Sequence, residues 1–221
     1  MSEPISRLYL ITPQVISPKT FQYPLSTALD AGDVGALQLR LKDVGDDEIR
    51  RAIDLLLPIS KAYKVPFILN DRPDIAREMG CDGVHIGQQD TCYQDARALI
   101  GKEAIIGITC HNSRHLAMEA AEKGADYVAF GAFFQSANKC TKFRASVSIL
   151  QWWQELMLTP CVAIGGITPE NGPSLVSAGA DFLAVIDAVW SHQKGPAEGV
   201  KAINSMILAS SSRIIASKET N

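Results

Sequence analysis

The sequence predicts an α/β protein with a single (β/α)8 barrel, the TIM-barrel architecture. Short apolar runs alternate with longer amphipathic segments along the chain, and this alternation implies a parallel sheet. Glycine closes several helical segments just before a strand, in KGAD at 123–126 and SAGAD at 177–181, with a weaker repeat in MGCD at 79–82. Eight such units in 221 residues fit a closed barrel. An open doubly wound sheet is the alternative, but no Gly-x-Gly-x-x-Gly motif follows the first strand.

Each predicted strand is a short apolar run bounded by polar or turn-forming residues. The first run, at the start of the chain, has the form of a buried strand. The second differs because polar residues alternate along it, at Gln38, Arg40 and Lys42. The eight runs are residues 8–12, 36–41, 66–69, 83–86, 105–109, 127–130, 161–164 and 182–186.

The predicted helices are the segments between these strands. The segment 48–63 has apolar residues at Ile49, Ile53, Leu56 and Ile59, which is close to helical spacing. The helices are expected at 25–32, 48–63, 73–79, 93–100, from 111–113 to 124, at 148–156, near Pro169 and at 197–208. We expect one barrel domain over residues 1–209 and a polar, frayed tail over 210–221.

Composition narrows the class of protein. The chain is 47% apolar and 20% charged, as in ordinary globular proteins, and its net charge of −3 argues against general nucleic-acid binding. No apolar run reaches the length of a membrane span, and the N-terminus lacks the form of a signal peptide, so we expect a cytoplasmic protein without membrane contact. The five cysteines are dispersed, which favours free thiols over a zinc site.

The barrel rule places an active site at the carboxyl ends of the strands. Asp71 and Asp90 follow neighbouring strands, so their carboxylates should meet at one edge of the sheet. Two carboxylates there would form a site for a hard divalent cation. The other residues at strand ends are Arg40, Lys42, Asn70, Thr109, His111, Lys139, Gly165, Gly166, Ile186 and Asp187.

Cations beside two carboxylates are typical of a site for a metal-bound polyphosphate. Arg40, Lys42 and Lys139 would neutralise phosphate charge that the metal leaves uncompensated. The pair Gly165-Gly166 could expose backbone N–H groups at a helix start and bind a second anion. The residues therefore predict two phosphorylated ligands, one of them with Mg²⁺.

Several of these residues also have purely structural interpretations. Asp90 could cap the next helix, and Asp71 could form a surface ion pair with Arg72. Gly165-Gly166 could be only a tight turn. The remaining structural interpretations are solvated charges for Arg40 and Lys42, a hydrogen-bonded core position for His85, a helix start for His111, and packing for Trp152 and Trp153.

The motifs together resemble the thiamine phosphate synthase family, in the superfamily that also contains thiazole tautomerase. The likeness covers nearly the whole chain, from Leu8 to about Val189. It is carried by QLRLK at 38–42, NDR at 70–72, DGVHIGQQD at 82–90, GITCHN at 107–112, GADYV at 124–128 and VAIGGI at 162–167.

The resemblance implies a transferase that joins hydroxymethylpyrimidine diphosphate to thiazole phosphate and releases diphosphate, with Mg²⁺ as cofactor. Asp71 and Asp90 are the implied metal ligands, and Arg40, Lys42 and Lys139 the implied catalytic cations. The implied partners are small molecules, and a homo-oligomer is possible. The implied substrate-binding residues are Gln38, Arg40, Lys42, Asn70, Thr109, Ser136, Asn138, Lys139, Gly166, Ile186 and Asp187.

Three departures from the family pattern leave alternatives open. The usual Pro-Thr-x-Thr-Lys loop reads QSANK at 135–139, Asp187 replaces a usual Ser, and Leu41 replaces a common Glu. The altered loop and Asp187 would both fit an alternative hypothesis, in which this chain is a weakly active homologue that binds phosphate ligands. The tautomerase is disfavoured because Ala132, not His, follows Gly131. The basic loop 131–146 could act as a lid.

Overall fold

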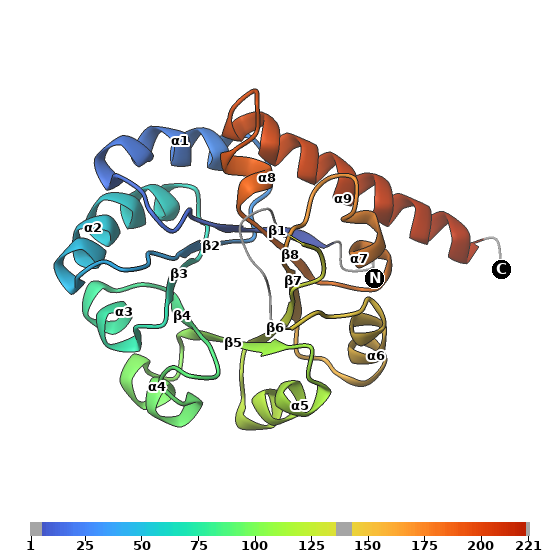
Figure 1. The fold of residues 1–221 in the computed structure, drawn as a ribbon, viewed down its shortest axis with the longest axis horizontal. Helices are drawn as coiled ribbons and strands as arrows, with labels where there is room; N and C mark the ends of the chain where they lie inside the picture. Colours follow the sequence, from blue (N-terminus) through green and yellow to red (C-terminus); the bar gives the residue numbers. More distant parts are fainter. Residues whose placement is uncertain (1–5, 136–142, 220–221) are drawn as a thin grey trace.

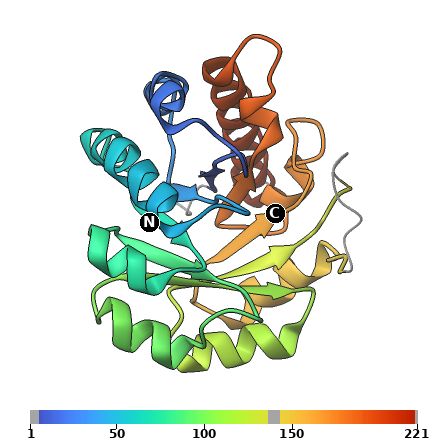
Figure 2. The ribbon, with the colours of Figure 1, turned by 60° about the vertical axis from the view of Figure 1, so that its left-hand side comes forward.

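The chain folds into a closed barrel of eight parallel strands with helices outside it (Figure 1). This computed structural model describes residues 6–135 and 143–219. Neighbours in sequence are neighbours in the barrel, and β1 pairs with β8 to close it. In the turned view the sequence colours still run in order around the barrel (Figure 2). The predicted (β/α)8 fold is confirmed.

The strands coincide with the predicted apolar runs to within two residues at each end. All are short, and their central residues are buried because helices cover the outside and side chains fill the inside. Their bounds are β1 Arg7–Ile11, β2 Ala36–Leu39, β3 Phe67–Asn70, β4 Gly83–Ile86, β5 Ile105–His111, β6 Tyr127–Gly131, β7 Cys161–Ile164 and β8 Phe182–Val185.

The helices match the predicted segments except at the two ends of the chain and after β7, where α7 begins at Pro173 and not near Pro169. Four of them, α3 to α6, lie within one residue of the expected bounds where bounds were predicted. The helices are α1 Pro18–Asp30, α2 Asp46–Ala62, α3 Pro73–Met79, α4 Tyr93–Ile100, α5 Arg114–Lys123, α6 Ser148–Leu156, α7 Pro173–Ser177, α8 Asp187–Trp190 and α9 Pro196–Glu219.

Helices α1 and α8 differ from the prediction. Helix α1 begins at Pro18, which suits a first turn, and runs through Pro24, although proline usually interrupts a helix. The short helix α8 is absent from the predicted segments. Its Trp190 indole donates to the Ile11 carbonyl at 2.7 Å and packs at a tilt against Phe21, so contacts distant in sequence hold it.

The C-terminal segment is helical and not a frayed tail through residue 219. Helix α9 continues well beyond the predicted end at Leu208 (Figure 1). Ser210 and Ser211 are buried, and the Ser210 hydroxyl donates to the Met206 carbonyl at 2.8 Å. Serine can bond back to the preceding turn in this way, so a polar sequence does not by itself end a helix. In the described part of the chain, every helix is too short or too polar to cross a membrane.

Two apolar regions stabilise the barrel. The larger lies between the strands and the surrounding helices. The smaller fills the barrel interior and consists of Tyr9, Ile11, Ala36, Tyr127, Ala129, Val162 and Ala184. Most of its side chains are apolar, so the two tyrosine hydroxyls within it need partners.

Candidate active site at the barrel mouth

Asp71 and Asp90 lie at the carboxyl ends of β3 and β4, which are paired strands. The Asp71 N–H donates to the His85 carbonyl at 2.8 Å, which holds Asp71 against β4 with φ at +66°. Asp tolerates this left-handed conformation better than most residues. The Asp90 Oδ2 accepts from the Gly87 N–H at 2.8 Å, and Cys92, not Asp90, occupies the cap position of α4. The helix-cap interpretation of Asp90 is therefore wrong.

The two carboxylates are electrostatic neighbours. Partial burial raises the pKa of the Asp90 carboxyl, and the nearby Asp71 carboxylate raises it further. A like charge disfavours ionisation, so the pair favours a bound cation. The Lys42 Nζ lies 2.9 Å from Asp71 Oδ2 and supplies part of that positive charge.

Arg72 turns away from Asp71. Its guanidinium bonds to Asp46 at the start of α2 and to Asp74 at the start of α3, the latter with Nη2 and Oδ2 2.7 Å apart. The Asp71–Arg72 surface pair considered from sequence is therefore wrong. Because Arg72 is engaged elsewhere, the Asp71 carboxylate remains at the barrel mouth with Lys42.

Arg40 brings a half-buried guanidinium to the same mouth. Burial lowers the pKa of Arg40, and the Asp71 carboxylate opposes that shift. Within residues 6–135 and 143–219, no carboxylate lies within 4.0 Å of its guanidinium nitrogens. A partly desolvated cation without an ion-pair partner favours an anionic ligand.

Gln38 and Asn70 form a polar pair beneath these charges. The Gln38 Nε2 donates to Asn70 Oδ1 at 2.6 Å, and Gln38 is only 3% exposed. With its oxygen occupied in this way, Asn70 keeps its Nδ2 hydrogens for another acceptor. A phosphate oxygen would satisfy that requirement.

Thr109 lies near the end of β5. Its carbonyl accepts from Gln88 Nε2 at 2.6 Å, so the loop after β4 is fixed to β5. Its hydroxyl lies 2.8 Å from His85 Nε2. His85 is thus a partly buried, hydrogen-bonded histidine of the barrel interior, and the structural interpretation from the sequence holds. His111, the last residue of β5, stacks on Phe143 with ring centroids 4.3 Å apart and does not begin α5, which starts at Arg114.

The glycine pair after β7 has a packing role. Gly165 and Gly166 have φ of +110° and +61°, and a Cβ on Gly165 would lie 2.4 Å from the Ala132 Cβ. The segment after β6 lies directly on them, with the Phe134 N–H donating to the Gly165 carbonyl at 3.0 Å. The tight-turn interpretation therefore accounts for glycine here, whether or not an anion also binds.

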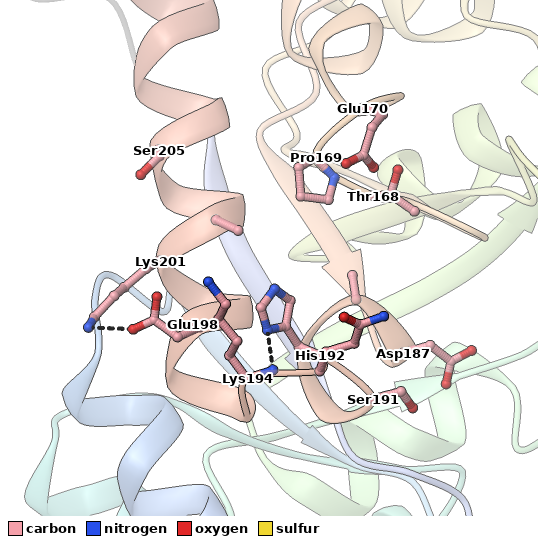
Figure 3. A pocket seen from close by; sticks show the side chains of 13 residues that line it. Thr168, Pro169, Glu170, Asp187, Ser191, His192, Lys194, Glu198, Lys201 and Ser205 are labelled. Carbon is pink, nitrogen blue, oxygen red and sulfur yellow. Dashed lines mark hydrogen bonds and ion pairs between the residues drawn. The ribbon is translucent and has the colours of Figure 1, made fainter.

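Ile186 and Asp187 form the junction of β8 and α8. The Asp187 carboxylate is exposed and lines a cavity of about 910 Å³ outside the two-carboxylate cluster (Figure 3). Lysines and carboxylates both line this cavity, and Glu198 and Lys201 neutralise each other at 2.8 Å. It is the larger cavity of the two described, yet its balanced charge makes it a poorer anion site than the barrel mouth.

Three residues expected at the site, Ser136, Asn138 and Lys139, lie outside the described residues. The segments on either side of them are held together at the base. The Ala132 N–H donates to the Phe143 carbonyl at 3.2 Å, and the Ala145 N–H donates to the Ala132 carbonyl at 3.0 Å. The described residues just before and just after this segment therefore both lie beside β6.

The donor set suits Mg²⁺ better than a structural metal. Among residues 6–135 and 143–219, no three His, Cys, Asp or Glu side chains gather at one point. Mg²⁺ is commonly held by one or two carboxylates, with substrate phosphate and water completing its shell. Asp71 and Asp90 fit that pattern. Four cysteines (Cys81, Cys92, Cys110 and Cys161) are free thiols.

Sequence inspection missed one group of polar residues, the tyrosines inside the barrel. Tyr127 OH lies 2.9 Å from His85 Nδ1 and 2.8 Å from Tyr9 OH. Both tyrosines fall within apolar runs, whose pattern indicates only that they are strand residues. A possible signal was Gly107, because a glycine inside a strand often marks a close approach by another group.

Comparison with known proteins identifies the family of this chain. A family model described as thiamine monophosphate synthase matches residues 8–189. The thiamine-phosphate synthases of Rhodospirillum centenum and Hyphomonas neptunium are 60% and 46% identical, over 90% and 92% of this chain and 96% and 94% of theirs. The thiamine phosphate pyrophosphorylase structure from Pyrococcus furiosus has a TM-score of 0.82 at 29% identity, covering 92% of this chain and 96% of that one. This chain therefore belongs to the thiamine monophosphate synthase family.

Proposed function

We propose that this protein couples hydroxymethylpyrimidine diphosphate to thiazole phosphate, giving thiamine phosphate and diphosphate. One observation carries the proposal. Two carboxylates, Asp71 and Asp90, share one edge of the barrel with the cations Lys42 and Arg40. The relatives from Rhodospirillum centenum and Hyphomonas neptunium are thiamine-phosphate synthases, which supports the same reaction. Ala132 after Gly131 offers no titratable group, so nothing supports the tautomerase alternative.

The proposed chemistry is a dissociative substitution. The bond between the pyrimidine methylene carbon and diphosphate breaks, and diphosphate leaves with the electron pair. The thiazole nitrogen then forms a new bond to that carbon. The negative charge that develops on the leaving group is the quantity to be stabilised, so preorganised cations and donors supply most of the catalysis.

The residues of this chain have distinct proposed roles in that step. Arg40 and Lys42 neutralise the departing diphosphate, together with Lys139, and Lys42 exchanges its Asp71 contact for a phosphate oxygen. Asn70 donates its Nδ2 hydrogens to diphosphate, an orientation that Gln38 maintains. Ser136, Asn138 and Thr109 add hydroxyl and amide groups. None of these roles requires a general base.

Asp71 and Asp90 are the proposed Mg²⁺ ligands. When bound, Mg²⁺ would supply Lewis-acid stabilisation of the diphosphate. The raised pKa of Asp90 supports a cation there, because a divalent ion would relieve the repulsion between the two carboxylates.

The thiazole phosphate is proposed to bind near Gly166, Ile186 and Asp187. Backbone N–H groups at the start of a helix have no intrahelical partner and can donate to an anion. The Asp187 carboxylate lies on the wall of the cavity in Figure 3 together with Lys194 and Ser191. Contact through the backbone alone would avoid the repulsion expected from a carboxylate beside phosphate.

Three untested expectations remain part of the proposal. They are a cytoplasmic location, a homo-oligomer, and a single barrel domain, which α9 extends beyond the expected end at residue 209. The solved relatives and the absence of long apolar helices in the described residues are compatible with a protein that acts on small molecules.

The coupling assay tests the proposed function. Purified protein with Mg²⁺ and both substrates should form thiamine phosphate and diphosphate in equal amounts. A reaction without the thiazole phosphate should form no thiamine phosphate. Failure to form product at high enzyme concentration, beside an active relative in the same buffer, would overturn the proposal.

Asp90→Asn should stabilise the metal-free protein at neutral pH and remove its response to Mg²⁺. Folding raises the pKa of Asp90, so the folded state disfavours the carboxylate and loses stability as pH rises through that pKa. Removing the charge should increase the free energy of unfolding of the metal-free protein by about 0.5 kcal/mol. This corresponds to a rise of roughly 1–2 °C in the melting temperature. Melting curves with and without Mg²⁺ measure both effects.

The pH dependence of stability distinguishes removal of the unfavourable Asp90 charge from any charge-independent effect of the Asn side chain. The difference between Asp90→Asn and the unchanged protein should be largest at neutral pH and vanish as pH falls to the ordinary Asp range, where both carry no charge at this position. A variant that is less stable at pH 7, or that still responds to Mg²⁺ as fully as the parent, would contradict the repulsion argument.

A further inference from the structure

A chain of hydroxyl and imidazole groups crosses the barrel interior to the mouth. It runs from Tyr9 on β1 to Tyr127 on β6, to His85 on β4, and ends at Thr109 on β5. The successive distances are 2.8 Å between the tyrosine oxygens, 2.9 Å from Tyr127 OH to His85 Nδ1, and 2.8 Å from His85 Nε2 to Thr109 Oγ1. The proposed roles of the diphosphate-binding residues do not use the first three members.

The space for this chain is provided by Gly107. Gly107 pairs with His85 on one side and with Tyr127 on the other, so it lies between them in the barrel wall. A Cβ at Gly107 would lie 1.9 Å from Tyr127 Cζ. The absence of a side chain on β5 therefore lets the Tyr127 ring reach across to His85, and the two rings stack with centroids 5.6 Å apart.

The two tyrosines are shielded from water, and His85 and Thr109 are partly buried. Tyr9 is 3% exposed and Tyr127 is 7% exposed. Both ring nitrogens of His85 lie beside hydroxyl groups, and among the described residues no carboxylate lies within 4.0 Å of the ring. A ring without an ion-pair partner in this mostly apolar interior favours the neutral imidazole. A neutral imidazole has one nitrogen that donates and one that accepts, and each hydroxyl has a single proton. The whole chain can therefore point in only two directions.

In the first direction every proton of the chain except that of the Thr109 hydroxyl has an acceptor within the chain. Tyr9 donates to Tyr127, Tyr127 donates to His85 Nδ1, and His85 Nε2–H donates to Thr109 Oγ1. The Thr109 hydroxyl accepts that bond and keeps its own proton for a group at the mouth.

In the opposite direction the Tyr9 hydroxyl proton has no acceptor among the described residues. Thr109 would donate to His85 Nε2, His85 Nδ1–H to Tyr127, and Tyr127 to Tyr9. The Tyr9 hydroxyl would then need another acceptor, and among the described residues its one hydrogen-bond partner is Tyr127. A buried donor without a partner retains its full desolvation penalty, so the first direction is favoured.

We propose that Tyr9, Tyr127 and His85 fix the His85 Nε2–H tautomer and so present the Thr109 hydroxyl as a hydrogen-bond donor to the pyrimidine diphosphate. The identity of that ligand rests on the proposed function, whereas the tautomer does not. Tyr127 and His85 are positioning residues that act through Thr109. The inference explains why polar groups interrupt an otherwise apolar barrel interior.

The tautomer can be read directly in the full-length protein without substrate. In protein labelled with ¹⁵N at histidine, long-range ¹H–¹⁵N correlation spectra distinguish the protonated from the unprotonated ring nitrogen. We expect His85 to carry its proton on Nε2 at neutral pH, and a His85→Gln variant assigns its signals among the four histidines. A proton on Nδ1 would overturn the proposal. This outcome is independent of the coupling assay.

Tyr127→Phe tests the connection to Thr109. The variant removes the donor to Nδ1, so we expect a changed His85 spectrum and a kcat/KM for the pyrimidine diphosphate about tenfold lower. Tyr93→Phe is the matched control, because it also removes a hydroxyl bond, 2.8 Å to the Gly124 carbonyl, but on the outside of the barrel. Its kcat/KM should not change.

The decisive comparison uses Thr109→Val as the background. If Tyr127 acts through Thr109, adding Tyr127→Phe to Thr109→Val should cause no further loss of kcat/KM. An additive further loss would overturn the proposed route, since it would indicate a general effect on the barrel. Melting curves of the four proteins identify any variant whose loss comes from unfolding, and the tautomer spectrum of the unchanged protein then decides the inference.

Discussion

Asp71→Asn is expected to lower the rate of thiamine phosphate formation about 10³-fold while the fold stays intact. Asn accepts the left-handed backbone that Asp71 adopts at φ +66°, so the backbone bond to His85 should remain. The substitution removes the charge of one of the two proposed metal ligands and the ion-pair partner of Lys42. Initial rates over a range of Mg²⁺ concentrations, together with a melting curve, measure the two expectations separately.

Asp43→Asn provides a matched control for that experiment. Asp43 also has positive φ, at +56°, and it lies next to Lys42 in sequence, but its side chain is exposed and forms no ion pair with the described residues. Its variant should keep the parental rate. Full activity of Asp71→Asn would mean that Asp71 does not hold the metal, whatever its proximity to Asp90.

Arg40→Ala should lower kcat/KM for the pyrimidine diphosphate by about 10²–10³-fold. Arg40 is half-buried, its pKa is lowered by desolvation, and the described residues give it no ion pair. Its charge is therefore available to the leaving diphosphate. Arg40→Lys should recover only part of the loss, because an ammonium group cannot reproduce the fork of a guanidinium. Steady-state kinetics on both substrates separate this effect from a change in thiazole phosphate binding.

Arg7→Ala is the control for the loss of an arginine. Arg7 lies at the opposite, amino end of β1 and forms an exposed ion pair with Asp33, with Nη2 and Oδ1 2.6 Å apart. Exposed pairs contribute roughly 0–1 kcal/mol to stability, so its removal should leave kinetics unchanged. If Arg40→Ala behaves like Arg7→Ala, diphosphate recognition must reside in other residues of the mouth.

The strands and the proximity of Asp71 and Asp90 were predictable because both depend on local patterns. Each strand is a compact apolar run, and the carboxyl ends of adjacent parallel strands meet at one edge of the barrel. Asp71 and Asp90 directly follow two such runs, so their approach follows from topology alone. The polar C-terminal segment was harder, because helix α9 is extended by burial of Ser210 and by bonds to its preceding turn.

The sequence by itself determined the order of eight strands, the two carboxylates at the mouth and the basic residues that follow β2. Only the tertiary structure decided that Lys42, and not the adjacent Arg72, is the partner of Asp71. It also decided that Tyr127 crosses β5 to reach His85, 42 residues away. Such contacts depend on side-chain direction and on the space left by Gly107 in the barrel wall. The direction of a side chain and the space at Gly107 cannot be read from the periodicity of one strand, because they depend on how β4, β5 and β6 pack together.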